Sequence, residues 1–293
     1  MNLVVGATGF LGSDICRLLV QQGQPVRALV RTTSDPAKKA ALQSLGIELV
    51  TGDLKDPASL AAACQGVSAV ITTASVTISR QPDDSIQAVD LDGQLHLLEA
   101  AKAAQVGQFI YISYSANIDV DCPLKTAKRT VEQAVQESGM TYTILRPSSF
   151  MEVWLSPIVG FDAAQANATV YGTGEQKISW ISLHDVTRFA VASLTNPAAR
   201  NAVLELGGPE ALSPLEVIKI FESVSGKTFT VQYVPAEALQ AQLAAATDPI
   251  QQSVAALMLA VTQGDEIDMR ETAEKFSLSL LSVEAFARQA LAA

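Results

Sequence analysis

The sequence predicts an α/β protein with a doubly wound parallel sheet and a smaller, mostly helical C-terminal domain. Three observations support this. Short apolar segments of four to seven residues alternate with helix-forming segments of ten or more, as in a series of βαβ units. The apolar segments are almost continuously hydrophobic, which is typical of strands covered by helices on both faces. A glycine-rich turn follows the first apolar segment directly, where such a sheet binds ligands.

The composition fits a fold of this size. The chain has 293 residues, 48% of them hydrophobic, enough for one large domain or for one domain and a smaller one. The formal net charge is -10, and the nearest approach to a basic cluster is Lys125, Lys128 and Arg129. We expect no nucleic-acid partner, because phosphate backbones require clustered Lys and Arg. The sequence shows no secretory signal and no apolar run of membrane-spanning length, so no membrane partner is expected.

Cysteines and histidines are few. Cys16, Cys64 and Cys122 lie far apart and form no C-x-x-C pair, which argues against a disulfide framework or a zinc site and fits a cytoplasmic location. The two histidines, His96 and His184, are too few for a histidine-rich metal site. No bound metal is expected.

The first strand and the turn after it give the strongest local signal. Apolar residues 3–5 run into G-x-x-G-x-x-G at 6–12, and a helix-forming segment follows up to Gly23. In the Rossmann fold such glycines permit a tight turn, close approach to a pyrophosphate and close packing of helix on strand, and the helix N-terminus binds the phosphates. No Lys-Ser or Lys-Thr follows, which excludes a P-loop and leaves a simple tight turn as the alternative. The expected cofactor contacts in this turn are Gly6, Thr8, Gly9, Phe10, Leu11 and Gly12.

The remaining elements of the sheet domain follow in order. Asp35-Pro36 and Asp56-Pro57 each begin a helix, with Asp as the N-cap and Pro at the first helical position. A long loop is expected at 73–84. Further strands are expected at 26–30, 47–50, 67–73, 108–113 and 141–148, and further helices at 92–104 and 128–139.

The regular alternation ends near residue 150. Residues 151–178 are expected to be irregular, whereas 178–182, a helix beginning at Asp185 as its N-cap, and a strand at 202–208 are expected to return to the sheet domain. A capping box at 213–216 begins a helix, and a strand at 228–234 and a helical tail from Ala236 follow. The expected domains are a cofactor-binding domain at 1–150, to which 179–207 returns, and a smaller substrate-binding domain at 151–293.

The end of the second strand indicates which dinucleotide is bound. An acidic residue there binds the ribose 2′-hydroxyl of NAD, whereas an Arg accommodates the 2′-phosphate of NADP. Arg31 stands there and Thr32, Thr33 and Ser34 follow, so we expect NADP(H) to be preferred over NAD(H); a solvated Arg is the alternative. Asp53 and Leu54, after the third strand, are expected to flank the adenine, with a turn-stabilising Asp as the alternative.

With these segments placed, the chain resembles the NmrA-like group of atypical and extended short-chain dehydrogenase/reductases. The last third agrees with the group only in general layout. The resemblance implies a nicotinamide cofactor and a place among quinone reductases, triphenylmethane reductases, isoflavone-reductase-like enzymes and redox-sensing regulators. The matching segments are GATGFLG at 6–12, LVR at 29–31, GDLKD at 52–56, residues 89–113, residues 128–150 and ISWISLHDV at 178–186.

The resemblance also implies an altered proton route. Short-chain dehydrogenases use a Tyr-x-x-x-Lys helix, in which Lys binds the nicotinamide ribose and lowers the pKa of the proton-transferring Tyr. Lys128 stands at the lysine position, but Leu124 stands at the tyrosine position. Substitutes are expected after the strand at 108–113, namely Ser113, Tyr114 or Ser115. Tyr114 is the best acid by chemistry, unless its side chain points into the core.

The same register implies the other contacts. Thr73, Ala74 and Ser75 are expected beside the cofactor ribose and pyrophosphate, and Pro147, Ser148, Ser149 and Phe150 beside the nicotinamide. Phe150, Met151 and Trp154 are expected to line an aromatic-substrate pocket, with a place in the core as the alternative for each.

The expected activity is an NADP(H)-dependent reduction of a small quinone-like or aromatic conjugated acceptor, by a monomer or homodimer. The alternative is a non-catalytic NADP(H)-sensing regulator or assembly factor that binds a protein partner. A sugar-nucleotide epimerase or dehydratase depends more strongly on the absent Tyr, and a Ser-His-Asp hydrolase has no nucleophile elbow here.

Overall fold

The computed structural model describes residues 1–77 and 81–292, and these form two compact units. Unit 1 comprises Met1–Ser113, Pro123–Leu145 and Val186–Leu204. Unit 2 comprises Tyr114–Cys122, Arg146–Asp185 and Glu205–Ala293. Each unit is discontinuous in sequence. The expected assignment of cofactor binding to 1–150 and of substrate binding to 151–293 stays a prediction.

A seven-stranded sheet with the order β3-β2-β1-β4-β5-β6-β9 organises unit 1. The pairings from β3 to β6 are all parallel, and the order reverses between β1 and β4, which confirms the predicted doubly wound Rossmann-type fold. The strands are β1 (Asn2–Val5), β2 (Val26–Val30), β3 (Glu48–Thr51), β4 (Ala69–Thr72), β5 (Gln108–Ile112), β6 (Thr141–Pro147) and β9 (Ala202–Leu206).

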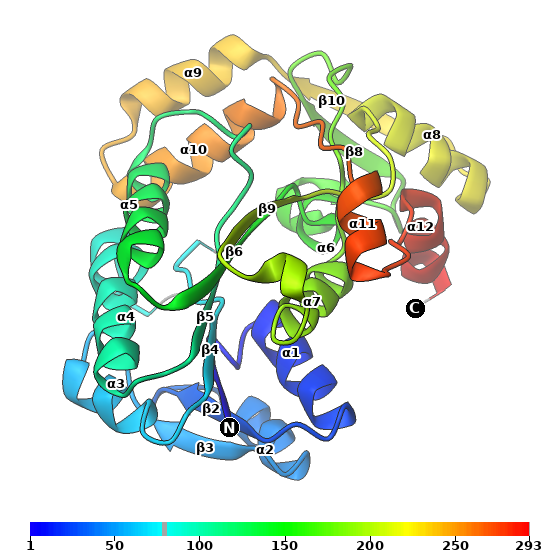
Figure 1. Ribbon diagram of the computed structural model, residues 1–293. Coiled ribbons are helices and arrows are strands. Elements are labelled where there is room, and N and C mark those ends of the chain that lie inside the picture. Colours follow the sequence, from blue (N-terminus) through cyan, green and yellow to red (C-terminus); the bar gives the residue numbers. More distant parts are fainter. Residues whose placement is uncertain (78–80, 293) are drawn as a thin grey trace. The chain divides into compact units, whose positions relative to one another are not determined.

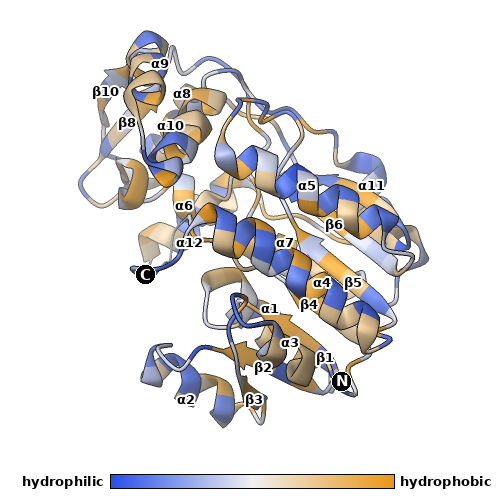
Figure 2. Ribbon diagram, turned by 90° about the vertical axis from the view of Figure 1, so that its left-hand side faces the viewer, coloured by the Kyte–Doolittle hydropathy of each residue, from blue (hydrophilic) through white to orange (hydrophobic). Residues whose placement is uncertain are grey.

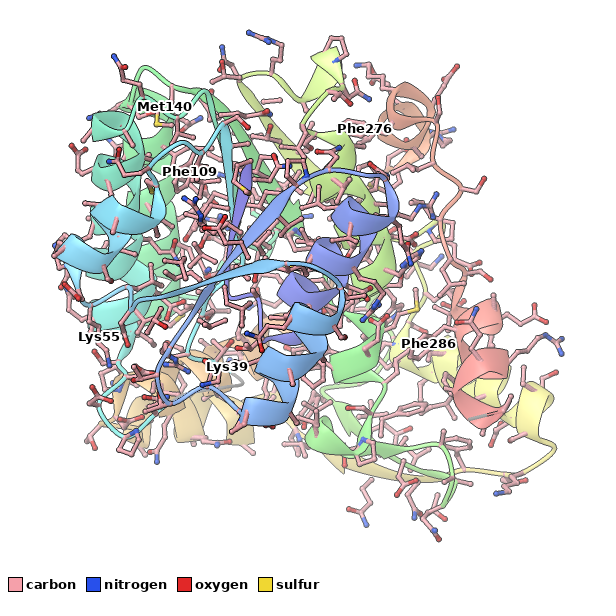
Figure 3. The ribbon with its side chains drawn as sticks, turned by 90° about the horizontal axis from the view of Figure 1, so that it is seen from below. Lys39, Lys55, Phe109, Met140, Phe276 and Phe286 are labelled. Atoms are coloured by element: carbon pink, nitrogen blue, oxygen red, sulfur yellow. The ribbon has the colours of Figure 1, made fainter. Side chains whose placement is uncertain are left out.

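Helices cover both faces of this sheet. Figure 1 shows α3, α4 and α5 on one face and α1, α2 and α7 on the other. The strands β1 and β2 between them are coloured hydrophobic in Figure 2, and Phe109 of β5 lies fully buried among side chains in Figure 3. The helices are α1 (Phe10–Gln21), α2 (Pro36–Ser44), α3 (Pro57–Ala63), α4 (Gly93–Ala103), α5 (Pro123–Glu137) and α7 (Leu183–Ala192), with the short 3₁₀ turn η3 (Pro197–Ala199).

Local capping explains where these helices begin. The Asp35 carboxylate accepts the N–H of Ala37 at 2.8 Å, and Asp56 accepts that of Ala58 at 3.1 Å, which confirms both predicted N-caps. The helix predicted at 92–104 is preceded by one π-helical segment, η1 (Ile86–Asp92), and the helix predicted at 128–139 begins earlier, at Pro123. Within the predicted loop 73–84, residues 78–80 lie outside the described residues.

Unit 2 contains a three-stranded sheet with the order β10-β8-β7. The strands are β7 (Phe161–Asp162), β8 (Asn167–Tyr171) and β10 (Thr230–Val234). The prediction of an irregular segment at 151–178 was therefore wrong for β7 and β8. Strand β8 owes its stability to β10, about sixty residues later in the chain, and such a distant partner leaves no local signal.

Helices α6, α8, α10 and α12 of unit 2 contribute to a hydrophobic cluster that includes Val170, Phe221 and Phe229. The predicted capping box is confirmed: Ser213 Oγ accepts the Glu216 N–H at 3.2 Å, and Glu216 Oε2 accepts the Ser213 N–H at 2.8 Å. The helices are α6 (Met151–Trp154), α8 (Pro214–Ser225), α9 (Ala236–Ala245), α10 (Pro249–Val261), α11 (Arg270–Phe276) and α12 (Val283–Ala292), with the 3₁₀ turn η2 (Pro157–Val159).

The helix predicted to begin at Asp185 begins at Leu183. Ser182 Oγ accepts the N–H of Asp185 at 3.0 Å, as an N-cap residue does. The buried Asp185 carboxylate instead accepts the N–H of Leu281 at 2.8 Å. The prediction of Asp185 as the N-cap was wrong, because its carboxylate holds a loop that lies far away in the sequence.

Candidate functional site

The glycine turn of unit 1 is a tight backbone cradle. Gly6 has a φ of +83°, and the N–H of Gly9 donates to Gly6 O at 2.9 Å. A Cβ on Gly12 would lie 2.2 Å from Gly6 O, and a Cβ on Gly6 would lie 2.6 Å from Thr73 Oγ1. Both contacts are far shorter than any van der Waals distance, so these two positions require glycine. The turn therefore has the close backbone packing that a pyrophosphate-binding loop needs.

Helix α1 begins directly behind this turn. Gly9 is its N-cap and provides no side-chain acceptor. In the described residues, Ser13 is the first residue of the helix whose N–H reaches a backbone carbonyl, that of Gly9 at 3.0 Å. The N–H groups of the first turn are thus available to an anion, and no carboxylate occupies that turn. Phe10, at the start of the helix, is 62% exposed.

Charged residues gather where β2 and β3 end. Arg31 Nη1 lies 2.7 Å from Asp84 Oδ2, and Lys55 Nζ lies 2.8 Å from Asp84 Oδ1. Lys55, labelled in Figure 3, also contacts the exposed Asp83 at 2.6 Å. Burial opposes ionisation of Asp84, but hydrogen bonds from Lys55, the Gln81 N–H and Arg31 hold the pKa of its carboxyl below the usual value. Asp84 is therefore a buried, ionised partner of two cations.

The turn that carries Arg31 is held by its own hydroxyl groups. The Arg31 N–H donates to Ser34 Oγ at 3.0 Å, and the Ser34 N–H returns to Arg31 O at 3.0 Å. Thr32 and Thr33 are exposed, and Lys39, also labelled in Figure 3, donates to Thr32 O at 3.3 Å. The predicted 2′-phosphate residues thus sit on one ordered turn.

The turn after β3 uses its acidic residue structurally. Asp53 Oδ1 accepts the N–H of Lys55 at 2.9 Å, which is the turn-stabilising bond that the sequence left as the alternative. Leu54 is buried, and a Cβ on Gly93 would come within 2.8 Å of its Cβ, so Leu54 packs against the start of α4.

The loop after β4 borders the glycine turn within unit 1. Thr73 Oγ1 donates to Val5 O at 3.3 Å, and Ala74 O accepts from Gln94 Nε2 at 3.1 Å. Ser75 Oγ lies 3.3 Å from Thr77 Oγ1. The three residues predicted beside the cofactor are half-buried, and the structure brings Thr73 next to Gly6.

A second buried ion pair lies behind the carboxyl end of β5. Lys128 Nζ on α5 is 3.8 Å from Asp90 Oδ1 on η1 and 3.3 Å from Ile112 O, and it stands 5.1 Å from the centroid of the Tyr111 ring. Both side chains are almost fully buried. Burial lowers the pKa of Lys128 and raises the pKa of Asp90, and each charge opposes the shift of the other.

The Asp90 carboxylate is only partly satisfied. Its Oδ2 accepts the Val76 N–H at 3.2 Å, but its Oδ1 has no hydrogen-bond partner among the described residues. A buried carboxylate oxygen without a partner is costly, so this oxygen faces a place where a ligand or water donor is needed. That place is beside Lys128, the residue that the resemblance assigns to the cofactor ribose.

Leu124 and two predicted proton donors, Ser113 and Tyr114, lie near the end of β5 in the sequence or one turn from Lys128 on α5. Leu124 stands at the usual tyrosine position and is buried one turn before Lys128. Ser113 Oγ, after β5, accepts from Arg129 Nη1 at 3.3 Å, and Arg129 also contacts the buried Glu132. Tyr114 is half-buried rather than enclosed in the core.

In unit 2, Ser115 joins a buried polar cluster. Its Oγ donates to Asp265 Oδ1 at 2.7 Å, and Asn117 Nδ2 donates to the same oxygen at 2.9 Å. The Asp265 main chain is fixed by Lys177 O and the Ser179 N–H, at 2.8 and 2.9 Å. The cluster holds the segment after β5 against the loop that precedes α11.

The predicted nicotinamide neighbours form an ordered, buried segment of unit 2. Pro147, Ser148 and Ser149 are buried, and Ser148 Oγ has no hydrogen-bond partner among the described residues. The Ser149 carbonyl accepts the Ile181 N–H at 3.0 Å. The segment is thus tied to the chain at Ile181.

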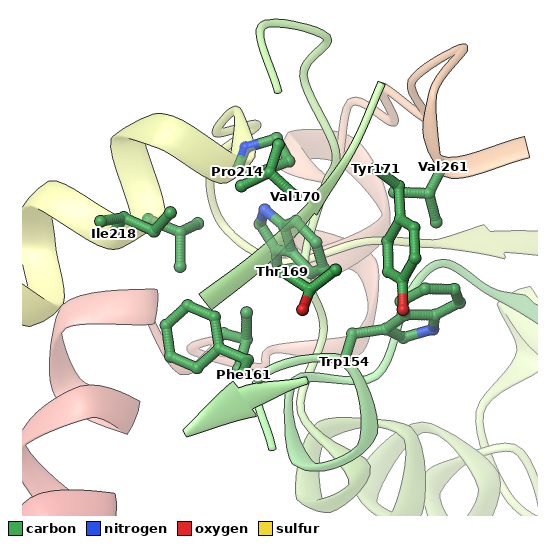
Figure 4. Close-up of a pocket in the computed structure, with 11 residues that line it drawn as sticks. Trp154, Phe161, Thr169, Val170, Tyr171, Pro214, Ile218 and Val261 are labelled. Carbon is green, nitrogen blue, oxygen red and sulfur yellow. The ribbon is translucent and has the colours of Figure 1, made fainter. Parts of the chain in front are cut away.

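The three predicted substrate residues have different environments. Met151 is fully buried in the hydrophobic cluster of unit 2, whereas Phe150 is half-buried. Trp154 lines a small cavity of about 30 Å³, in which its ring stands edge-on to Tyr171 at 6.4 Å between centroids (Figure 4). That volume is large enough for a water molecule but far below the ~150 Å³ of an engineered cavity that binds benzene.

Three site carboxylates escaped the sequence analysis: Asp84, Asp90 and Asp265. Asp90 stands in the segment D-L-D-G just before a helix, where an acidic residue reads as a cap. Asp84 and Asp265 lie in loops, and their cationic or hydroxyl partners come from distant segments. No local pattern marks any of them as buried.

The described residues contain neither a candidate metal site nor a candidate membrane-spanning helix. Across 1–77 and 81–292, no group of three or more His, Cys, Asp or Glu side chains could hold a metal ion. No helix in those ranges is both long and apolar enough to cross a membrane.

The sheet order and the glycine turn define the class of fold, a Rossmann-type α/β protein. Residues 2–287 match the model of the NmrA-like family, and the chain belongs to that family.

Known relatives agree with this assignment. The NAD(P)H azoreductase of Xenophilus azovorans is 34% identical over 247 residues, which cover 83% of this chain and 80% of that protein. The photosystem II assembly factor Ycf39 of Trieres chinensis is 32% identical over 241 residues, which cover 80% of this chain and 72% of that protein. The NADPH-dependent quinone oxidoreductase QOR2 of Escherichia coli, solved with NADPH, has the same fold. Its TM-score is 0.81 at 23% identity, over 99% of this chain and 100% of that one.

Proposed function

We propose that this protein is an NADP(H)-dependent reductase of a small quinone-like or aromatic conjugated acceptor. The observation that carries the proposal is the glycine cradle of unit 1, whose close packing leaves no room for a Cβ at Gly6 or Gly12. Relatives whose names specify NAD(P)H and an azo or quinone acceptor support it. When bound, NADPH supplies a hydride from its nicotinamide ring.

The residues proposed to hold the cofactor follow the sheet edge. The N–H groups at the start of α1 would bind the pyrophosphate. Arg31 and Thr32 would bind the 2′-phosphate, and Lys128 the nicotinamide ribose. The remaining proposed contacts are Thr8, Gly9, Phe10 and Leu11 of the turn, Asp53, Leu54, Thr73, Ala74 and Ser75 of unit 1, and Pro147 and Ser149 of unit 2.

We propose that Lys128 and Asp90 together manage the proton of the reaction. Lys128 Nζ and Asp90 Oδ1 stand 3.8 Å apart, and burial lowers the pKa of Lys128 and raises the pKa of Asp90, so each group gives up its charge more easily than it would in water. Ser113 and Tyr114 remain proposed proton donors. Because Leu124 replaces the usual Tyr, we propose an acceptor whose reduced form takes its proton readily from water, as quinones and conjugated dyes do.

Replacing Arg31 by alanine is expected to lower the ratio of NADPH affinity to NADH affinity about tenfold, because a charge-assisted bond to the 2′-phosphate is lost. Fluorescence titration with each nucleotide measures the ratio. Arg27→Ala is the matched control. Arg27 lies at the other end of β2 and bonds Glu48, Ala63 O and Gln65 O, so its loss should leave the ratio unchanged.

The function itself is tested by NADPH oxidation at 340 nm against quinones, azo dyes, triphenylmethane dyes and simple carbonyl compounds. We expect turnover with the conjugated acceptors and little with simple carbonyls. Tight NADPH binding without turnover of any acceptor would contradict the reductase.

The Leu124 substitution and the Ycf39 relative favour a second candidate, a non-catalytic NADP(H)-sensing regulator or assembly factor with a protein partner. Limited proteolysis with NADP⁺ and with NADPH distinguishes the two functions. Different cleavage patterns for the two nucleotides, without turnover, support the sensor, and identical patterns count against it.

We propose a cytoplasmic monomer or homodimer. Cys16, Cys64 and Cys122 are buried, and none of them forms a disulfide with another described residue. Burial raises the pKa of Cys16 to about 12 and that of Cys64 to about 11, so these two thiols stay protonated and unreactive.

A further inference from the structure

We propose that Asp84 limits how strongly this protein prefers NADPH to NADH, by binding Arg31 with an internal carboxylate. The proposal rests on the NADP(H) binding proposed above. It assigns the degree of the preference for NADPH to a residue that lies outside the turn 31–34 at the end of β2. Asp84 acts through Arg31 and is therefore a positioning residue.

The geometry places Asp84 between two cations. Its Oδ2 lies 2.7 Å from Arg31 Nη1 and its Oδ1 lies 2.8 Å from Lys55 Nζ. The Gln81 N–H donates to Oδ2 at 2.8 Å and fixes the carboxylate further. Only 1% of the Asp84 side chain is exposed, whereas 30% of the Arg31 side chain is exposed. Arg31 thus binds a buried anion on one side and reaches solvent on the other.

This arrangement has two consequences for a phosphate. The ion pair orients the guanidinium, whose remaining N–H donors have no hydrogen-bond partner among residues 1–77 and 81–292 and can serve a second anion. The carboxylate also cancels much of the positive charge of Arg31 that a doubly charged 2′-phosphate would meet. The 2′-hydroxyl of NADH carries no charge, so its binding depends little on the orientation or the net charge of Arg31. Asp84 therefore weakens NADPH binding selectively and reduces the preference for NADPH over NADH.

Lys55 shares the Asp84 carboxylate with Arg31, and the other two carboxylates near Lys55 have separate roles. Asp83, the other carboxylate on Lys55, is 72% exposed, so solvent screens it. The Asp53 carboxylate accepts the N–H of Lys55 within its own turn. Among these three carboxylates, Asp84 is the one that contacts Arg31.

The test is equilibrium titration of Asp84→Asn with NADPH and with NADH, without an acceptor. Asparagine keeps an oxygen for the Gln81 N–H but removes the charge. We expect the ratio of NADPH affinity to NADH affinity to rise about tenfold, mainly through tighter NADPH binding. An unchanged or lower ratio would overturn the proposal. Should the amide not fold there, Asp84→Ser removes the same charge and must move the ratio in the same direction.

Two further measurements separate charge from structure. Asp83→Asn removes an exposed carboxylate from the same cluster and should leave the ratio within about twofold of the wild type. In an Arg31→Ala background, Asp84→Asn should no longer change the ratio; a full effect there would overturn the claim that Asp84 acts through Arg31. These readouts need binding only, so a chain that binds both nucleotides but reduces nothing would refute the reductase and still test this inference.

Discussion

Replacing Lys128 by methionine is expected to destabilise the protein by about 3–5 kcal/mol near pH 8, because it leaves Asp90 buried without its cation. The same change should lower reductase turnover by at least ~100-fold, the usual range for a group that manages a proton. Urea unfolding at several pH values and NADPH oxidation with a quinone measure the two effects.

The pH dependence of this destabilisation has a definite sign. Without Lys128 the pKa of Asp90 rises further above its unfolded value, so the folded variant binds a proton that the unfolded chain releases. Stability of the variant therefore falls as the pH rises from the unfolded pKa toward the folded pKa. We expect a smaller loss of stability at pH 5 than at pH 8.

Lys125→Met is the matched control, since Lys125 lies on the same helix and is only half-buried. It should change the free energy of unfolding by less than about 1 kcal/mol. If Lys128→Met proves as mild as this control at every pH, Asp90 and Lys128 do not form the ion pair described here.

Replacing Gly12 by alanine is expected to remove NADPH binding almost completely. The new Cβ would lie 2.2 Å from Gly6 O and 3.0 Å from Ala7 Cα, and backbone atoms cannot rotate away as a side chain can. The turn must open, which should cost about 3 kcal/mol of stability and weaken NADPH binding at least ~100-fold. Thermal unfolding and fluorescence titration measure these effects.

Gly107→Ala is the control for this prediction. A Cβ at Gly107 meets its nearest atom, Ser68 O, at 3.3 Å, so a small adjustment suffices and about 1 kcal/mol or less is expected. Equal behaviour of the two variants would show that the glycine turn is not the close-packed cradle inferred here.

Much of the fold of unit 1 could be predicted because its signals are local. The glycine turn, the Asp-Pro helix starts and the apolar strands each depend on a few adjacent residues, and the structure places them as expected. Strand β8 could not be predicted in this way, because it pairs with β10 from a distant segment, and β7, which pairs with β8, is only two residues long. Asp185 was misassigned for the same reason, since its partner Leu281 lies 96 residues later in the chain.

The candidate site shows the same difference between residues with local signals and residues whose partners are distant in the sequence. Arg31 and Lys128 were found from strand-end position and family register. Their buried partners, Asp84 and Asp90, were not found, because an ion pair between distant segments leaves no periodic pattern in the sequence. The residues proposed to contact the cofactor are therefore easier to predict from sequence than the buried carboxylates that compensate the charges of Arg31 and Lys128.

We propose that bound NADPH delivers a hydride to an acceptor in this protein, and a single-turnover experiment tests this most directly. The preformed complex is mixed with a quinone, and with an azo dye, using NADPH deuterated at either face of nicotinamide C4. We predict rapid loss of the 340 nm absorbance in proportion to the acceptor reduced, slowed by deuterium at one face only. Oxidation no faster than in free solution, or no isotope effect with either label, would contradict it.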